Sequence, residues 1–326
     1  MDPESGAMMT AVCHSPRFKP MESHIEVVLA SDANYVMPMS VVLASAAMNC
    51  SEDRLLKIHI IEKGYSESLK ERVKESLNQV RPSNLQLHWY PVSLEGLSDL
   101  PIVQSHLSLM TYSRLLLPQL LPKTVRLALY LDCDVLVEGD LSELWDEHKP
   151  QKALGAVRDR IGSVGSLGGL SNFQELRISP DTPYFNAGVL FINVEAWREE
   201  AIGNRVFDYL RKYNSILQFE DQEALNAVLY DSWTELPQRW NQQIVPRYFR
   251  RGSDVALPNL IENGIIHFIT SEKPWIPGCE YSERRRFYEY LDRTDWRGWR
   301  TKTHHEIYVR SKRALGDLWR LARQKS

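Results

Sequence analysis

The chain has 326 residues, enough for one large α/β domain or two smaller ones, and 43% of them are hydrophobic, as in globular proteins. Its formal net charge of −3 argues against a general nucleic-acid-binding surface. No apolar run reaches the roughly 18 to 20 residues that span a bilayer, no signal-peptide pattern stands near the start, and the four cysteines form no Cys-x-x-Cys pair. We therefore expect a cytoplasmic protein of a reducing compartment that binds no nucleic acid.

The first half of the chain alternates apolar strands with amphipathic helices. We predict strands at 26–30, 56–61 and 85–90, and helices at 36–49 and 66–80. This β-α-β-α-β order implies a mainly parallel sheet with right-handed crossovers. No Gly-x-Gly-x-x-Gly and no Walker sequence occurs, so the sequence does not favour dinucleotide or P-loop binding.

Two carboxylates interrupt the next buried strand. An apolar run at 126–131 leads into Asp132, and a second run, 135–137, follows Asp134 directly. Residues i and i+2 of an extended chain point to the same side, so both carboxylates can face one divalent cation. From the residues alone, an ordinary acidic turn between two strands remains an equal alternative. In open α/β sheets, ligands bind outside the carboxyl ends of the strands, which is where this pair falls.

The second half continues the α/β pattern. A helix is predicted to open at Thr111, and the remaining expected elements are strands at 153–157, 184–193 and 264–269, with helices at 195–213 and 221–229. The segments 163–173 and 243–253 are expected to be loops.

Several motifs, taken together and in order, resemble the retaining glycosyltransferases of family 8. The match covers roughly residues 24 to 276 and is carried by the segments 28–35, 111–115, 130–137, 185–193 and 221–222, and by His267 followed by Lys273-Pro274-Trp275. Members of this family include bacterial lipopolysaccharide α-galactosyl- and α-glucosyltransferases and glycogenin. The resemblance implies an α/β protein with the A-type glycosyltransferase fold, a Rossmann-like domain with a mixed central sheet.

The resemblance assigns a metal site and a UDP-sugar site. Asp132, Asp134 and His267 correspond to the ligands of Mn²⁺, with Mg²⁺ as the alternative ion. The uridine pocket corresponds to Ala30, Asp32, Asn34 and Tyr35. The other donor contacts are Arg114, Cys133 and Lys273, together with the two metal-binding aspartates. Read by themselves, Asp32 and Asn34 could equally be turn formers, and His267 a core histidine.

The sugar-binding side corresponds to Asp159, Asn186, Asp221 and Gln222, although acidic residues such as Asp221 also commonly cap helices. Retention at the anomeric carbon needs either a nucleophile or a front-side displacement. Gln222, a poor nucleophile, stands where the family places its nearest β-face group. We therefore expect front-side displacement, with the leaving-group oxygen as base and Asp159, Asp221 or Asn186 stabilising positive charge on the ring.

One position departs from the family pattern. Relatives usually carry a glycine within the segment from His267 to Lys273, where backbone amides approach phosphate, and this chain has Thr270 there. Glycine permits a close approach and positive φ, so threonine predicts a different loop path or a hydroxyl contact.

Three segments are expected. Residues 1–21 are polar and aperiodic, and form a disordered N-terminus or the remnant of a cloning tag; residues 22–282 form the catalytic domain; residues 283–326 form a basic amphipathic tail.

The tail is strongly basic. From residue 293 onward there are ten basic and three acidic residues, which gives a net charge of +7 there and −10 in the remainder of the chain. Basic amphipathic helices with tryptophans bind anionic lipid, so the tail predicts peripheral attachment to the inner face of the membrane, unless it is a solvated helix packed on the domain.

The expected function is transfer of a hexose from UDP-galactose or UDP-glucose to a glycan or lipopolysaccharide-type acceptor, with an α-linkage. Two alternatives stay open: a nucleotide-sugar-binding protein that has lost catalysis, and a self-glucosylating protein of the glycogenin kind.

Overall fold

A central sheet of seven strands organises the protein in the computed structural model, which describes residues 24–104, 109–247, 260–309 and 311–312. The strands run in the order β3-β2-β1-β4-β7-β6-β8. The first four are parallel, and β7 is antiparallel to both β4 and β6, so the predicted mixed sheet is confirmed. Their bounds are β1 (His24–Asp32), β2 (Leu55–Lys63), β3 (Leu85–Pro91), β4 (Leu127–Leu131), β6 (Leu154–Ser163), β7 (Pro183–Asn193) and β8 (Trp233–Glu235).

A second, three-stranded sheet lies beside the first. It contains β5 (Val135–Val137), β10 (Ile265–Phe268) and β9 (Gln242–Ile244) in that order. In the register of this sheet, His267 pairs with Val135 on one side and Gln243 on the other. Residues 132–134 carry the chain from β4 of the large sheet to β5 of the small one. The two aspartates therefore sit at the junction of the sheets.

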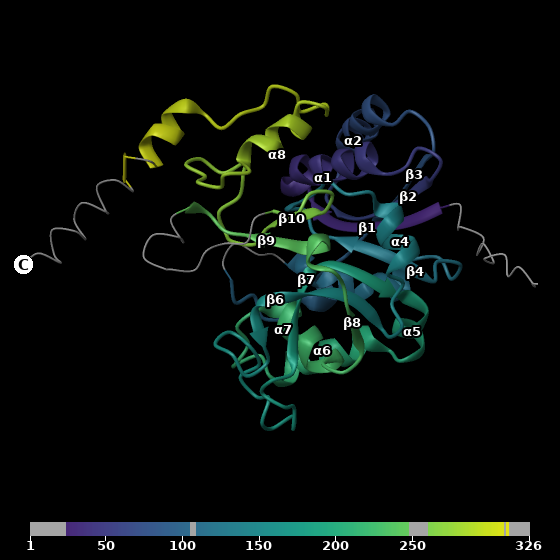
Figure 1. The fold of residues 1–326 in the computed structure, drawn as a ribbon, viewed down its shortest axis with the longest axis vertical. Coiled ribbons are helices and arrows are strands. Elements are labelled where there is room, and N and C mark those ends of the chain that lie inside the picture. The colour runs from purple at the N-terminus through teal and green to yellow at the C-terminus, as the bar shows by residue number, and fades with distance from the viewer. Residues whose placement is uncertain (1–23, 105–108, 248–259, 310, 313–326) are drawn as a thin grey trace, which may run out of the picture.

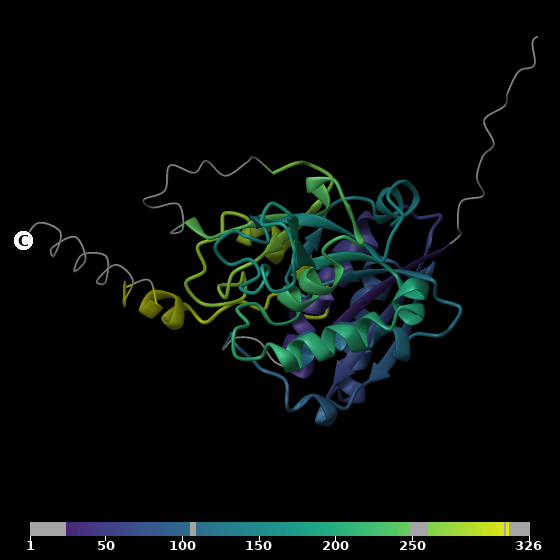
Figure 2. The ribbon, with the colours of Figure 1, turned by 90° about the horizontal axis from the view of Figure 1, so that it is seen from below.

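Helices cover both faces of the central sheet (Figure 1). One hydrophobic core joins the sheet to α1 (Val36–Asn49), α2 (Glu67–Val80), α4 (Leu141–Glu147) and α8 (Arg284–Leu291). The other joins it to η3 (Leu109–Leu116), α3 (Leu117–Leu120), α5 (Val194–Glu199), α6 (Ile202–Lys212) and α7 (Glu220–Leu229). Figure 2 shows this second layer from below, with its green helices in front of the strands. Short 3₁₀ turns occur at η1 (Ala33–Tyr35), η2 (Glu95–Leu97) and η4 (Gln238–Asn241).

Two predicted helices differ from the structure. The helix expected at 195–213 is broken, because Ala201 adopts a left-handed conformation (φ 50°) between α5 and α6. The turn lets α6 pack so closely on η3 that a Cβ on Gly203 would lie 2.4 Å from the carbonyl oxygen of Leu115. The helix expected to open at Thr111 is instead the 3₁₀ helix η3 followed by the single turn of α3.

The first part of the predicted tail packs on the body of the protein. Phe287, Leu291 and Trp296 are buried and belong to the same core as α1. Residues 313–326, where most of the amphipathic helix was expected, and residues 1–21 lie outside the described part of the chain. Within that part, none of the helices combines the length and the apolar character that a membrane span requires.

Candidate active site

A cleft of about 610 Å³ opens where β1 and β4 end at their carboxyl sides. Every residue that the sequence nominated for the site lines this one cleft. The lining includes Ala30, Asp32, Asn34, Tyr35, Arg114, Asp132, Cys133, Asp134, Asp159, Asn186, Asp221, Gln222, His267 and Lys273.

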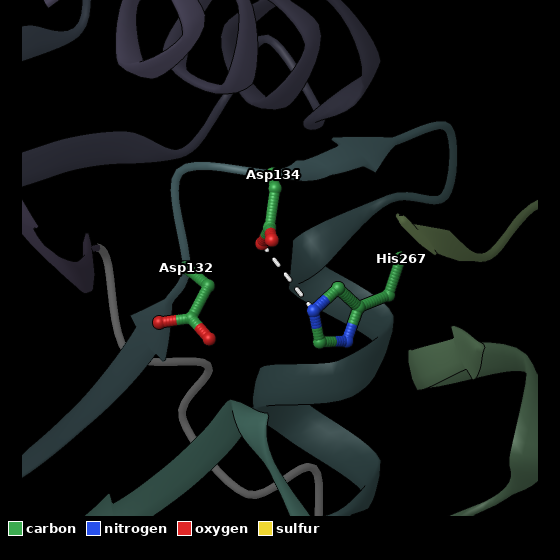
Figure 3. A group of neighbouring side chains, drawn as sticks. All are labelled: Asp132, Asp134 and His267. Carbon is green, nitrogen blue, oxygen red and sulfur yellow. Dashed lines mark ion pairs between the residues drawn. The ribbon is translucent and has the colours of Figure 1, made fainter. Parts of the chain in front are cut away.

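Asp132, Asp134 and His267 converge at the floor of the cleft (Figure 3). Each offers one ligand atom, and these atoms all lie within 4.8 Å of one another. The imidazole Nε2 of His267 lies 3.3 Å from Oδ1 of Asp134, while Nδ1 lies 3.0 Å from the side-chain oxygen of Asn241. Two carboxylates and an imidazole are a donor set suited to Mn²⁺ or Mg²⁺.

One atom of this group favours a cation directly. Oδ1 of Asp134 is buried and has no hydrogen-bond partner within the described residues. A buried carboxylate oxygen without a hydrogen bond is costly, and the imidazole of His267, 3.3 Å away, offers this one a charge partner only when it is protonated. The residues present therefore fit a divalent ion between Asp132, Asp134 and His267.

The two aspartates differ in their electrostatic surroundings. Burial by itself raises the pKa of Asp134, but Lys273 and His267 outweigh it and hold the pKa well below its ordinary range. The Nζ of Lys273 donates to Oδ2 of Asp134 at 2.6 Å. For Asp132, burial is the largest cause and raises the pKa to about 6, with Asp134 acting in the same direction and Arg114 opposing it. A bound cation would favour the ionised form of both groups.

Arg114 joins the metal end of the cleft to the sugar end. This guanidinium is buried, donates to Oδ1 of Asp132 at 2.8 Å, and has its Nε 2.8 Å from Oδ2 of Asp221. It also lies over the ring of Tyr130, whose hydroxyl donates to Asp132. The hydroxyl of Thr111 donates to the second oxygen of Asp221. Arg114 thus fixes two carboxylates that come from different elements.

Amide side chains hold the sugar end in place. The Nδ2 of Asn186 donates to Oδ2 of Asp159 at 2.8 Å, and Nε2 of Gln222 donates to the same oxygen at 3.3 Å. The other oxygen of Asp159 accepts from the backbone N–H of Ile161. Gln222 in turn accepts from the N–H of Ala187. These contacts leave Asp159 and Gln222 rigid at the edge of the cleft.

The predicted uridine residues follow β1. Oδ1 of Asp32 accepts from the N–H of Asn34 and caps η1, so this carboxylate forms a turn as well as lining the cleft. Tyr35 packs edge-on against Trp275 with ring centroids 6.0 Å apart. Cys133 donates from its thiol to the carbonyl of Ala30, and burial, assisted by the neighbouring aspartates, raises the pKa of that thiol well above its usual value.

Thr270 does not line the cleft within the described structure. Its hydroxyl lies 2.9 Å from the hydroxyl of Tyr281, and its backbone N–H donates to the same Tyr281 oxygen. Both of its polar groups therefore bind the protein itself. Lys273, from the same segment, adds a positive charge at this end of the cleft.

Sequence analysis missed four residues that shape the site. Asn241 binds His267, and Gln243 binds the backbone on both sides of Asp159 through the carbonyl of Arg158 and the N–H of Arg160. The signal was the run of three amides after Trp240, because buried amides need hydrogen-bond partners. The other two, Gly188 and Tyr130, lie within apolar strand sequences that gave no such signal.

Comparison with known proteins agrees with this geometry. The sequence profile described as "Glycosyl transferase family 8" matches residues 26–277. The chain belongs to glycosyl transferase family 8. The resemblance read from the motifs is thereby confirmed, and this family 8 protein is a glycosyltransferase.

The similarity extends over most of the chain. This family 8 glycosyltransferase is 27% identical over 281 residues to general stress protein A of Bacillus subtilis, covering 83% of this chain and 94% of that protein. It is 24% identical over 282 residues to the lipopolysaccharide 1,2-glucosyltransferase of Escherichia coli, covering 84% and 79%. Among solved structures, the galactosyltransferase LgtC, crystallised with donor and acceptor sugar analogs, is 26% identical with a TM-score of 0.70, covering 83% of this chain and 96% of that one. The predicted A-type glycosyltransferase fold is confirmed.

Proposed function

We propose that the protein is a divalent-metal-dependent, retaining hexosyltransferase. It transfers galactose or glucose from a UDP-sugar to a glycan or lipopolysaccharide-type acceptor and forms an α-linkage. The observation that carries this proposal is the single cleft in which the cluster of Asp132, Asp134 and His267 faces Asp159 and Gln222.

The metal end of the cleft suits a sugar diphosphate. Asp132, Asp134 and His267 would hold the ion, which when bound neutralises charge on the departing diphosphate. Lys273 is buried and lies beside Asp134, so its ammonium adds a fixed positive charge at the same end. Tyr35 and Asp32 offer an aromatic face and a carboxylate acceptor for the uracil and ribose.

Retention is the outcome that the family resemblance implies, and it needs either a nucleophile at the sugar end or a front-side displacement. Asp221 is engaged by Thr111 and Arg114, and Asp159 accepts hydrogen bonds on both oxygens. We therefore favour front-side displacement. The bond from the anomeric carbon to the diphosphate oxygen breaks, the acceptor oxygen bonds to that carbon, and the acceptor proton passes to the departing phosphate oxygen. Asp159 stabilises the positive charge that develops on the ring.

Relatives support a glycan acceptor. The proteins of Escherichia coli and Salmonella typhimurium that this chain resembles are named lipopolysaccharide 1,2-glucosyltransferase and lipopolysaccharide 1,3-galactosyltransferase. We therefore propose a galactose or glucose donor and a lipid-linked acceptor sugar for this chain. We further propose that the segments 163–173 and 243–253 shape the acceptor pocket, although residues 248–253 lie outside the described part of the chain.

The test is UDP release from a panel of UDP-sugars, with Mn²⁺ and with EDTA, and without acceptor. We expect metal-dependent release from UDP-galactose or UDP-glucose. His267→Ala should abolish it, and His305→Ala, at an exposed histidine outside the cleft, should not. Binding of UDP with Mn²⁺, but no release of UDP from any UDP-sugar of the panel, would support the non-catalytic alternative. A gain of intact mass with donor alone would support self-glucosylation, and mass-spectrometric trapping of a glycosyl adduct on Asp221 would contradict front-side displacement.

We also propose that the C-terminal tail attaches the protein to an anionic membrane surface on the cytoplasmic side. Ile307 and Tyr308 are 61% and 64% exposed, and Trp299 is 38% exposed, in a segment rich in basic residues. Co-sedimentation with anionic liposomes of the full chain, of a truncation after Lys312, and of Ile307→Glu tests this. The truncation leaves α8 and the buried Trp296 intact. Equal partitioning of all three proteins would contradict the proposal.

A further inference from the structure

A continuous chain of hydrogen bonds connects the metal end of the cleft to the sugar end. Nδ1 of His267 lies 3.0 Å from Oδ1 of Asn241, and Nδ2 of Asn241 donates to Oδ1 of Asn186 at 2.8 Å. Asn186 then donates to Asp159 at 2.8 Å, and Gln222 donates to the same Asp159 oxygen. His267, Asn241 and Asn186 are all buried, so the contacts among these three are shielded from bulk water, whereas Asp159 is partly exposed.

The carboxylate at one end determines the direction of every donor in the chain. An ionised Asp159 can only accept, so Asn186 must turn its amino group toward it and its oxygen toward Asn241. The N–H of Gly188 donates to that same oxygen at 3.0 Å, which fixes the orientation of Asn186 independently. Asn241 must then present its amino group to Asn186 and its oxygen to His267. That oxygen can be satisfied only if Nδ1 of His267 carries the ring proton.

The other ring nitrogen is thereby left as an acceptor. Nε2 of His267 faces Oδ1 of Asp134 at 3.3 Å, and that oxygen has no hydrogen-bond partner in the described structure. A second ring proton on Nε2 would make His267 a cationic donor to Asp134, whereas in the neutral Nδ1–H form the two facing lone pairs are stabilised by a bound cation.

We propose that Asn241 is a positioning residue for the metal site: it fixes the Nδ1–H tautomer of His267 and so keeps Nε2 available to the ion. The inference rests on the proposed metal-dependent function. Asn241 does not line the cleft in the described structure. It acts through His267, and its partner Asn186 connects it to Asp159 at the sugar end.

The test uses the full chain with Asn241→Leu, Asn241→Asp and the control Asn172→Ala. Asn172 is also buried, but it binds Tyr209 and lies outside the cleft. Mn²⁺ affinity is measured from the spin-resonance signal of the free ion. Loss of a residue that orients a metal-ligating histidine typically weakens metal binding about 10- to 100-fold, and we expect this for Asn241→Leu. Asn241→Asp retains an acceptor for Nδ1–H but loses the donor to Asn186, so it should bind Mn²⁺ more tightly than Asn241→Leu, while Asn172→Ala should stay within a few-fold of wild type. Thermal unfolding confirms that each variant is folded.

The tautomer itself provides a second readout that needs neither metal nor substrate. Two-bond ¹H–¹⁵N spectra of histidine-labelled, metal-free protein are recorded about two pH units above the ordinary histidine pKa of about 6.5, with His267→Gln for assignment. We expect His267 to carry its proton on Nδ1 in wild type and to lose this preference in Asn241→Leu. A proton on Nε2 or on both nitrogens in wild type, or wild-type Mn²⁺ affinity in Asn241→Leu, would overturn the inference. Failure of wild type to bind Mn²⁺ would instead overturn the proposed metal dependence, and the spectra would still decide the tautomer.

Discussion

Gly188 faces the imidazole of His267 so closely that no side chain fits between them. A Cβ on Gly188 would lie 2.2 Å from Cε1 and 2.8 Å from Nδ1 of His267. The carbonyl of Gly188 also accepts from the N–H of Asp132 at 2.9 Å. One glycine on β7 therefore supports two of the three residues assigned to the metal.

We predict that Gly188→Ala displaces His267 and weakens Mn²⁺ binding at least tenfold. The added methyl group has no space, and overpacking of this kind costs about 1–3 kcal/mol of folding stability. Calorimetric titration with Mn²⁺ and thermal unfolding measure the two effects. Gly96→Ala is the matched control, because a Cβ there meets nothing within 4 Å. Wild-type Mn²⁺ affinity in Gly188→Ala would show that the clash between the added Cβ and the imidazole is relieved without moving His267 out of its metal-binding position.

Asp132 is predicted to reduce the stability of the metal-free protein. Its pKa in the folded state is raised from 3.8 to about 6, so the folded chain holds this proton more tightly than the unfolded chain does. Above about pH 6 the carboxylate of Asp132 is ionised while buried, and this lowers the free energy of unfolding by up to about 3 kcal/mol at neutral pH. In EDTA, Asp132→Asn should therefore melt at a higher temperature than wild type at pH 7, and the difference should shrink as the pH falls from about 6 toward 4.

The same pair of proteins tests the role of the ion. Mn²⁺ should raise the melting temperature of wild type, because it binds the folded state alone, and should leave Asp132→Asn nearly unchanged. If the difference in melting temperature between Asp132→Asn and wild type in EDTA grew toward acid pH, the raised pKa of Asp132 would be contradicted. An equal response of both proteins to Mn²⁺ would contradict the ligand assignment.

Lys273 is predicted to act on the diphosphate and to compete with the metal. Its Nζ donates to Oδ2 of Asp134 and to the carbonyl of Phe268, so its position is fixed before any donor binds. Lys273→Ala should lower UDP release about 10²- to 10³-fold, the usual effect of removing one preorganised electrostatic group. Its Mn²⁺ affinity without nucleotide should not fall, because Asp134 loses a competing cation. Lys63→Ala, at an exposed position outside the cleft, is the control. Loss of Mn²⁺ binding in Lys273→Ala would mean that Lys273 mainly orients Asp134.

Features that depend on neighbouring residues in the sequence could be predicted from the sequence. The alternation of apolar runs gave the parallel part of the sheet, and the spacing of Asp132 and Asp134 gave the acidic pair at its edge. The break at Ala201 could not be predicted in this way, because α6 turns to pack on η3, which lies far away in the sequence. Hydrophobic periodicity continues through that break and hides it.

The contacts that organise the site are also long-range. The motif resemblance named Arg114 as a donor contact, but nothing in the sequence predicted its burial between Asp132 and Asp221. Gly188 on β7 and Asn241 at the end of η4 both reach His267 on β10 through contacts between segments far apart in the sequence. Side-chain types and spacing predict which groups do the chemistry. They do not reveal which neutral residues orient those groups.

Glu306 anchors the start of the C-terminal helical segment to the loop that carries Lys273. Its carboxylate accepts from the N–H of Gly278 at 2.8 Å, from the guanidinium of Arg284 at 2.5 Å, and from the hydroxyl of Thr301. Arg284 also donates to the carbonyl of Pro274, next to Lys273. We predict that Glu306→Gln destabilises the protein by about 1–3 kcal/mol, the range for hydrogen bonds to a charged group.

The stabilisation by Glu306 should depend on pH, because folding lowers the pKa of its carboxyl group. Burial alone raises the pKa of Glu306, but Arg284, Thr301 and the N–H of Gly278 outweigh it and lower the pKa from 4.5 to about 2. The stabilising contribution is therefore complete above about pH 4.5 and is lost as the pH falls toward 2. The difference in unfolding free energy between wild type and Glu306→Gln, from urea titrations at several pH values, should follow this course. Glu289→Gln, which removes an exposed ion pair with Arg285, should change stability by less than about 1 kcal/mol at every pH. A Glu306→Gln effect as small as this control would show that the contacts of Glu306 add little to the attachment of the tail.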